Sequence, residues 1–150
     1  MKSWNRREFI AAGAAFGALP GVTFGRSSAM MTKPIPASGE RLPVIGLGTY
    51  NVFDVESTAE EIATRKAIVD RLTGAGGSLL DTSPMYNRSE RVIGDVIDAG
   101  ASRQDLFLAT KVWTDGKESG IRQMARSAEL MRTDVIDLMQ VHNLRDTAVH

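Results

Sequence analysis

Three ionisable side chains follow short apolar runs of this sequence at nearly equal intervals. Asp81 ends the first run, Lys111 follows the second and His142 follows the third. Each interval is about 30 residues, which is the length of one βα unit of a parallel sheet. Tyr86 lies in the proline-containing loop just after Asp81. We therefore expect these four side chains to meet at one edge of a parallel sheet.

Together these four groups could transfer a proton. A free tyrosine, with a pKa of about 10, is a weak acid at neutral pH. A nearby lysine ammonium favours the phenolate, an aspartate can hold that ammonium, and a histidine can donate a hydrogen bond to a substrate oxygen. Individually, Asp81 could instead cap a helix, Lys111 could reach out from a sheet edge, Tyr86 could pack in a loop and His142 could belong to the core. Their joint position at the active-site rim of a βα pattern favours an enzyme.

The residues between them predict the elements that would hold this arrangement. A Ser-Gly turn predicts a hairpin over residues 33–44, and residues 44–50 are typical of a first parallel strand. Ser57 or Thr58 can cap a first helix, and a second helix starts at Ser89. The predicted order is hairpin, β, α, β, α, β, α, β, with the continuous apolar strands of a helix-covered parallel sheet. The fold class is α/β.

Each predicted helix has an apolar face that would pack on the sheet. These faces are Ala59, Ile62, Val69 and Leu72 in the first helix, Val92, Ile93, Val96 and Ile97 in the second, and Ile121, Met124, Ala125, Ala128 and Met131 in the third. The first strand alternates Gly46 and Gly48 with apolar residues. Glycine in a strand indicates either the close approach of a ligand or tight packing, and both interpretations stay open here.

Composition limits the class of protein. The 150 residues are enough for one domain with a core, and 18 basic residues balance 18 acidic ones, so charge gives no support for nucleic-acid binding. The chain has no cysteine, which excludes disulfides, thiolate metal sites and a cysteine nucleophile. His142 and His150 alone do not make a set of metal ligands, so we expect no metal site.

The first 29 residues differ from the rest and predict an export signal, leaving residues 30–150 as the folded domain. A basic start with Arg6-Arg7 precedes an uncharged stretch rich in alanine and glycine, and cleavage after Ala29 would suit a signal peptidase. The arginine pair resembles the twin-arginine export motif, which implies export machinery as a partner and a periplasmic or secreted protein. A membrane-anchoring helix and a cytoplasmic location are the alternatives, but the apolar run is shorter than the about 20 residues of a membrane span.

Six stretches in order resemble the N-terminal half of an aldo-keto reductase. They cover residues 35 to 143 and are Gly46–Tyr50, Gly77–Tyr86, Ser89-Glu90 with Ile93-Gly94, Leu106–Trp113, Asp134–Leu138 and Gln140–His142. The resemblance implies a (β/α)8 TIM barrel with an N-terminal hairpin, of which this chain carries the first four barrel strands. It also implies an oxidoreductase that reduces small aldehydes and ketones with NADPH, without excluding NAD.

The same resemblance implies roles for particular residues. Tyr86 would be the general acid that protonates the carbonyl oxygen, Lys111 held by Asp81 would assist it, and His142 would orient the carbonyl. The cofactor would contact Gly48, Thr49, Tyr50 and Asp81. Trp113 would line the substrate pocket together with Tyr86 and His142, although it could also be a loop aromatic that covers the rim.

The length of the chain qualifies these expectations. A complete barrel takes about 250 residues, so we expect a truncated product whose open strand edges invite self-association. Three hypotheses follow. The chain is the N-terminal half of an exported carbonyl reductase, a dimer that completes the barrel in trans, or a non-catalytic remnant that needs a complementary half.

Overall fold

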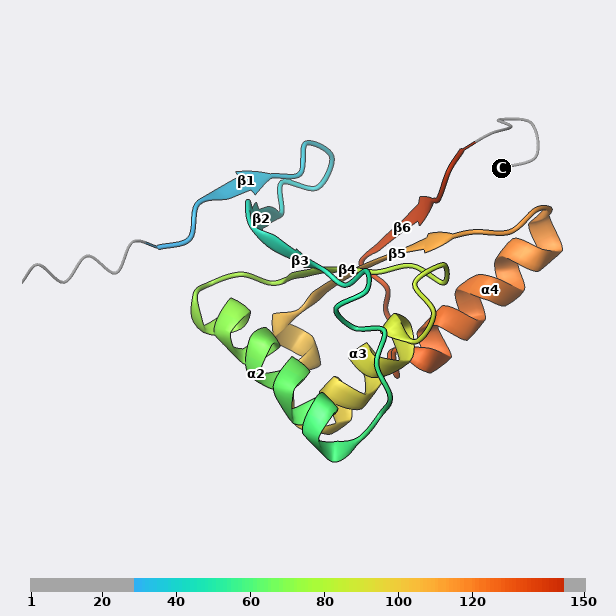
Figure 1. Cartoon of the computed structure of the whole chain (residues 1–150). Helices are drawn as coiled ribbons and strands as arrows, with labels where there is room; N and C mark the ends of the chain where they lie inside the picture. Colours follow the sequence, from blue (N-terminus) through green and yellow to red (C-terminus); the bar gives the residue numbers. More distant parts are fainter. Residues whose placement is uncertain (1–28, 145–150) are drawn as a thin grey trace, which may run out of the picture.

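The computed structural model describes residues 29–144, which form a hairpin followed by a four-stranded parallel sheet (Figure 1). The hairpin pairs β1 (Thr32–Pro34) with β2 (Arg41–Pro43) in antiparallel register. The sheet has the order β3-β4-β5-β6, and every neighbouring pair is parallel. Its strands are β3 (Gly46–Gly48), β4 (Leu79–Asp81), β5 (Phe107–Val112) and β6 (Leu138–Val141). The predicted α/β order is therefore confirmed. Residues 1–28, which hold nearly all of the predicted export signal, lie outside the described residues.

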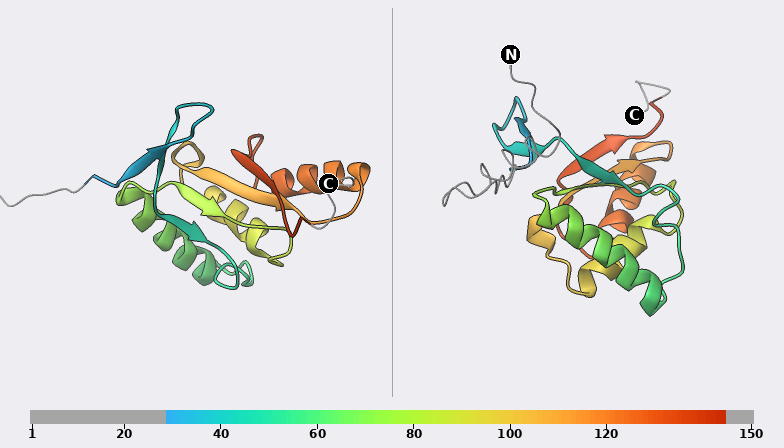
Figure 2. Two further views of the ribbon diagram at one scale, coloured as in Figure 1. Left: turned by 90° about the horizontal axis from the view of Figure 1, so that it is seen from above. Right: turned by 60° about the vertical axis from the view of Figure 1, so that its left-hand side comes forward.

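Three helices cover one face of this sheet (Figure 2). They are α2 (Ala59–Gly74), α3 (Ser89–Asp98) and α4 (Lys117–Leu130). The cap of α2 is Thr58, whose hydroxyl accepts the Glu61 N–H at 3.2 Å. This contact decides between the two predicted caps. The start of α3 at Ser89 is confirmed, and the chain leaves this helix through Gly100, whose φ of 100° is readily adopted only by glycine.

The core lies between the helices and the sheet. Leu80 and Leu108 of the sheet pack there with side chains from all three helical segments, namely Ile62, Val69, Val92, Ile93, Val96 and Met131. The inward faces predicted for α2 and α3 are therefore largely confirmed, but Ala59 is exposed. The predicted face of α4 is wrong at Ile121, which is 51% exposed, and at Ala125, which is also exposed. The packing partners of α4 are α3 and β5, so the flank that carries Ile121 has no described element over it.

Both outer strands of the sheet have open edges. Within residues 29–144, β3 pairs only with β4, and β6 pairs only with β5. Large apolar side chains are exposed beside both edges: Val44 and Ile45 before β3, and Leu138 and Val141 in β6. A continuous apolar strand predicts burial, and β6 departs from this prediction because it has a neighbour on one side only. In residues 29–144 no helix combines the length and apolarity that a bilayer crossing needs.

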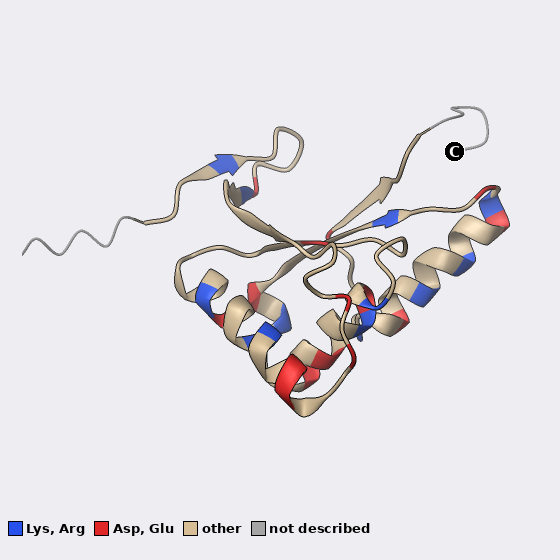
Figure 3. Ribbon diagram, viewed as in Figure 1, with Lys and Arg blue, Asp and Glu red and all other residues tan. Residues whose placement is uncertain are grey.

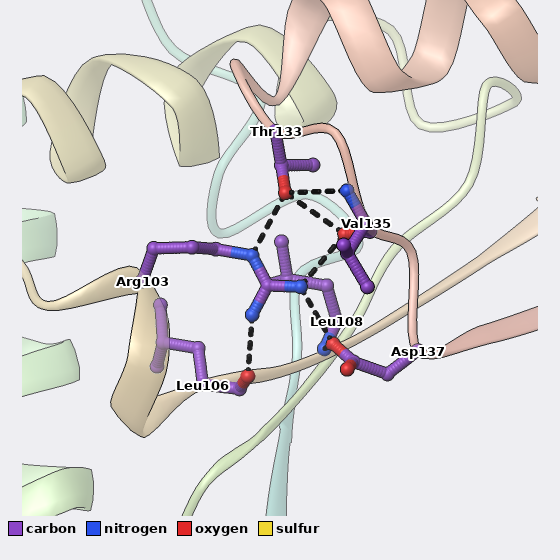
Figure 4. Close-up of polar contacts among 6 residues, drawn as sticks. All are labelled: Arg103, Leu106, Leu108, Thr133, Val135 and Asp137. Atoms are coloured by element: carbon purple, nitrogen blue, oxygen red, sulfur yellow. Dashed lines mark hydrogen bonds and ion pairs between the residues drawn. The ribbon is translucent and has the colours of Figure 1, made fainter.

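A network of hydrogen bonds ties the chain together at the amino ends of β5 and β6 (Figure 4). The guanidinium of Arg103, from the short 3-10 helix η1 (Arg103–Asp105), donates to Thr133 Oγ1 at 2.9 Å and to the Leu106 carbonyl at 2.6 Å. It also donates to the Val135 carbonyl at 2.7 Å and to Asp137 Oδ2 at 2.8 Å. One side chain thus joins η1 to the segment that enters β6.

Candidate active site

The strand register places a single ion pair on the sheet. Asp81 and Lys111 are the only charged residues within β3–β6 (Figure 3). Asp81 pairs with Ala109, and Lys111 lies two residues further along β5, so the two side chains project from the same face. The Lys111 ammonium donates to Asp81 Oδ1 and Oδ2 at 2.8 and 2.9 Å and to the Thr82 carbonyl at 2.8 Å. All three of its protons are therefore used.

Tyr86 occupies the centre of the group. Its ring centroid lies 5.1 Å from that of Tyr50 and 5.8 Å from that of His142, both edge to face. Lys111 Nζ lies 5.3 Å from the same centroid. The structure thus brings together the four side chains that the spacing predicted. The ammonium faces the ring of Tyr86, and within residues 29–144 the Tyr86 hydroxyl has no hydrogen bond.

The turn that presents Tyr86 is built from its own backbone. The Tyr86 N–H donates to the Ser83 carbonyl at 2.9 Å, and the Ser89 N–H donates to the Tyr86 carbonyl at 3.0 Å. Asp54 supports this turn from the loop after β3, because its carboxylate accepts from Asn87 Nδ2 at 2.7 Å and from the Arg88 guanidinium at 3.2 Å. These hydrogen bonds, that from Asn87 first, hold the pKa of Asp54 below its ordinary value.

His142 is fixed by its backbone and by its ring. Its N–H donates to the Val112 carbonyl at 2.9 Å, which continues the β5–β6 ladder by one residue. Its Nδ1 lies 2.8 Å from Ser83 Oγ, and Ser83 is fully buried. Sequence reasoning did not identify Ser83, although its place two residues after Asp81 puts it in the same loop as Tyr86.

The end of β3 provides open backbone beside this group. A side chain at Gly46 would collide with Leu79, whereas the space around Gly48 is open to at least 4 Å. Tight packing therefore explains the glycine at position 46, whereas Gly48 is open to the close approach of a ligand. Thr49 is fully buried, and its hydroxyl donates to the Asp81 carbonyl at 3.0 Å. Gly48 and the exposed ring of Tyr50 are thus the parts of this segment that a ligand can reach.

Trp113 lies just after β5 with 43% of its surface exposed. Gln123 of α4 holds its backbone at both ends, accepting from the Trp113 N–H at 2.5 Å and donating to the Trp113 carbonyl at 3.2 Å. The indole is available to line a pocket, as the resemblance implies, and it makes no ring contact with Tyr86 or His142 in the described part of the chain.

A buried acid lies behind Lys111. Glu90, in the first turn of α3, is 2% exposed and accepts a hydrogen bond from Thr110 Oγ1 at 2.7 Å. Burial raises the pKa of Glu90 above its ordinary value, while the Thr110 hydroxyl and the positive charge of Lys111 act in the opposite direction. Sequence reasoning placed Glu90 at the start of a helix and in one of the stretches that resemble the family, but gave no reason for its burial.

Each of the three rings, Tyr50, Tyr86 and His142, is followed by an asparagine in the left-handed conformation. The φ angles are 58° at Asn51, 49° at Asn87 and 56° at Asn143. Asparagine adopts this conformation more readily than other residues with a side chain. The repeated pair of ring and asparagine is visible in the sequence as Tyr-Asn, Tyr-Asn and His-Asn, and this repeat is a signal of the site that the spacing of the strands does not contain.

The site is suited to a nicotinamide ring better than to a metal ion. Residues 29–144 contain no group of three or more histidine, cysteine or acidic side chains that could hold a metal. By contrast, the backbone of Gly48 is open and lies in register with Asp81, and the exposed ring of Tyr50 follows two residues later. Among the residues predicted to contact the cofactor, Gly48 and Tyr50 are accessible to such a group, whereas Thr49 is fully buried and the Asp81 carboxylate is bonded to Lys111.

Comparison with known proteins matches this chain to one family. The aldo/keto reductase family model matches residues 44–149. Glyoxal reductase of Bacillus subtilis is 31% identical over 107 residues, which are 70% of this chain and 36% of that protein. The 9,11-endoperoxide prostaglandin H2 reductase of Trypanosoma cruzi is 33% identical over 104 residues, or 68% and 34% of the two chains. The chain thus spans about a third of the length of these curated relatives.

The fold agrees with this match. The structure of an aldo-keto reductase from Klebsiella pneumoniae in complex with NADPH superimposes with a TM-score of 0.60 and 28% identity. The superposition covers 78% of this chain and 41% of that one. The four parallel strands and the preceding hairpin are therefore a part of a (β/α)8 barrel, and Asp81, Lys111 and His142 lie at the carboxyl ends of its strands, where active sites of such barrels are found.

Proposed function

This chain belongs to the aldo/keto reductase family, and from that premise we propose that it carries the proton-donating half of an NADPH-dependent carbonyl reductase. The observation that supports this most directly is the convergence of Lys111, Tyr50 and His142 on the ring of Tyr86. Its substrates would be small aldehydes and ketones, in line with the name of the glyoxal reductase of B. subtilis. NADPH is proposed over NAD because the K. pneumoniae relative was solved with NADPH.

The four side chains would divide the work as follows. Tyr86 gives its proton to the carbonyl oxygen as negative charge develops there. Lys111 stabilises the resulting phenolate, and Asp81 keeps the ammonium in place through two hydrogen bonds. His142 donates a hydrogen bond to the same oxygen and so orients the carbonyl. Trp113 closes the substrate side of the site.

The cofactor would lie on the open backbone at the end of β3. Gly48, Thr49 and Tyr50, with Asp81, would hold its nicotinamide end, and when bound it supplies the hydride. The exposed ring of Tyr50 would face the nicotinamide, whereas Thr49 would act through its backbone because its hydroxyl is bonded to the Asp81 carbonyl. Tyr86 and His142 would then hold the carbonyl oxygen, which receives the proton, so that the carbonyl carbon faces the hydride.

The test is reduction of glyoxal by the purified chain, followed as the loss of NADPH absorbance. Replacing Tyr86 with phenylalanine should lower the rate by about 10²- to 10⁴-fold, the contribution of a general acid. Tyr50→Phe is the matched control, because it removes a hydroxyl from the neighbouring ring of the same stack and should change the rate far less. Unchanged activity in Tyr86→Phe would contradict the role given to Tyr86.

The alternative is a non-catalytic fragment that needs a complementary half. The mass of the particle in solution and a fluorescence titration with NADPH separate the two. A dimer that binds NADPH and reduces glyoxal supports an enzyme completed by a second copy through the open edges of β3 and β6. A monomer that binds no NADPH supports the fragment.

We also propose export by the twin-arginine route, with residues 1–29 as the signal and a periplasmic or secreted product. This route carries folded proteins and would suit an enzyme that binds its nicotinamide cofactor before export. A reporter fused to residues 1–32 should be exported, and Arg6-Arg7→Lys-Lys should block it. Export that is unaffected by this change would remove the proposal and favour a cytoplasmic protein.

A further inference from the structure

One buried hydroxyl contacts the proposed active site without belonging to its four groups. Ser83 Oγ lies 2.8 Å from His142 Nδ1, within hydrogen-bond distance. Ser83 has no exposed surface, so water cannot reach its Oγ to compete for this hydrogen bond. It comes from the loop after β4, whereas His142 follows β6, so the contact joins two strands that are not neighbours in the sheet.

The remaining contacts of Ser83 decide which of the two atoms is the donor. Ser83 Oγ accepts the Met85 N–H at 3.2 Å, and within residues 29–144 its only other hydrogen-bond contact is His142. If Nδ1 carried the proton, it would donate to Oγ, and the serine proton would be buried without an acceptor. Buried donors are rarely left unsatisfied. The serine hydroxyl therefore donates, and Nδ1 accepts.

This assignment fixes the state of the other ring nitrogen. A neutral imidazole carries one proton, so an accepting Nδ1 leaves the proton on Nε2. The ring is held by its edge-to-face contact with Tyr86, and the residue is anchored by the hydrogen bond from its backbone N–H to the Val112 carbonyl at 2.9 Å. Nε2 has no hydrogen-bond partner in the described part of the chain, and it is therefore free to donate to a ligand.

We propose that Ser83 is a positioning residue that selects the Nε2–H form of His142 and aims it at the carbonyl oxygen beside Tyr86. The catalytic consequence rests on the proposed function, whereas the proton assignment does not. Ser83 touches neither substrate nor cofactor in this proposal. It acts through His142, in the way that a hydrogen bond at one ring nitrogen commonly determines the state of the other.

The proton assignment can be measured directly by NMR. The chain has two histidines, so the His150→Gln variant leaves His142 as the only source of imidazole signals. Long-range proton–nitrogen correlation spectra at a pH where the ring is neutral should show Nδ1 unprotonated and Nε2 protonated. In Ser83→Ala both nitrogen shifts should move toward those of free histidine. A protonated Nδ1 in the parent chain, or shifts that do not change in Ser83→Ala, would overturn the assignment.

Matched variants separate this effect from a general disturbance of the fold. Ser127→Ala removes another buried serine hydroxyl, on α4, and should leave the His142 shifts unchanged. Ser83→Thr keeps a hydroxyl at the same position and should restore the parent shifts. If Ser127→Ala moves the His142 signals as much as Ser83→Ala does, the proposal fails.

The kinetic consequence is tested with the reductase assay. Ser83→Ala should lower kcat by about tenfold, the equivalent of one hydrogen bond, with little change in KM. A kcat equal to that of the parent would overturn the positioning role even if the shifts move. If the parent chain reduces no carbonyl compound, the proposed function fails, and the NMR result alone decides the assignment for Ser83.

Discussion

The two ends of the parallel strands use their polar groups in opposite ways. At the amino ends, Arg103 donates four hydrogen bonds, and Asp137 also accepts the Leu108 N–H at 2.8 Å. At the carboxyl ends, the Lys111 ammonium is equally well bonded, but the Tyr86 hydroxyl and His142 Nε2 have no partner in the described residues. The amino end thus uses its main donor, the Arg103 guanidinium, in bonds within the protein, whereas the carboxyl end keeps the Tyr86 hydroxyl and His142 Nε2 free.

This difference separates the tasks of the two ends. Groups that are already hydrogen-bonded in such a network mainly stabilise the structure, because a ligand would have to break a bond to gain one. Free donors next to a fixed ion pair can instead bind a developing negative charge without rearrangement. The division agrees with the general behaviour of βα barrels, whose active sites lie at the carboxyl ends of the strands.

The largest effect on stability should come from the amino-end network. Arg103→Ala should lower the free energy of unfolding by about 2–3 kcal/mol, because it removes four hydrogen bonds, among them the ion pair with Asp137 and the donor to the Leu106 carbonyl. Lys111→Ala should cost only about 1 kcal/mol, because the Asp81 side chain is 37% exposed and water can take the place of the ammonium. Urea denaturation measures both values.

A control and a reversal complete this test. Arg126→Ala breaks an exposed pair with Glu129 and should change the free energy of unfolding by less than about 0.5 kcal/mol. If Lys111→Ala proves more destabilising than Arg103→Ala, the separation of tasks between the two ends is wrong. The carboxyl end would then be a stabilising region as well.

A smaller effect should appear as a dependence of stability on pH at Glu90. Because burial raises the pKa of this carboxyl in the folded chain, the folded state keeps the proton over a range in which the unfolded state has lost it. Stability should therefore fall as the pH rises from about 4.5 through the raised pKa, by about 1.4 kcal/mol for each unit between the two values.

Variants of the buried pair check the sign of this change. In Glu90→Gln the fall in the free energy of unfolding should disappear, as measured by urea denaturation at a series of pH values. Thr110→Val should make the fall larger, because the hydroxyl no longer stabilises the carboxylate. A fall of the same size in Glu90→Gln would assign it to other groups. Glu90 would then not be the source of the pH dependence, and the comparison of the two ends would no longer include a buried acid behind Lys111.

The smallest effect should come from the asparagines behind the rings. Asn87→Ala should cost about 1 kcal/mol, because alanine resists the left-handed conformation. Asn87→Gly is the matched variant, since glycine adopts this conformation freely, and it should cost clearly less. Thermal unfolding ranks the two. Equal losses would show that the Asn87 side chain matters more than its backbone angle.

Much of the fold follows from local patterns in the sequence. Apolar runs at intervals of one βα unit, the cap at Thr58 and the start at Ser89 placed the strands and helices correctly, because each depends on neighbouring residues. The exposure of Ile121 and of Leu138 could not be predicted in the same way. Each of these depends on which elements lie beyond α4 and β6, and a local pattern carries no information about that.

The site was predictable for the residues that end strands. Asp81, Lys111 and His142 share a position relative to their strands, so the spacing alone brought them together. Ser83 and Asp54 act through contacts between loops distant in the sequence, and no regular spacing marks them. The face-on approach of Lys111 to the ring of Tyr86 is a matter of side-chain conformation, which sequence patterns do not encode.

The edge-to-face contact of Tyr50 with Tyr86 has an optical consequence. These are the only two tyrosines in the chain, so the whole tyrosine spectrum originates at the carboxyl end of the strands. The tyrosine contribution to the near-ultraviolet circular dichroism, which overlaps that of the two tryptophans, should therefore report on this one cluster, with coupling between two rings held 5.1 Å apart. A ligand that binds beside Gly48 should therefore change the signal of this tyrosine pair without any added label.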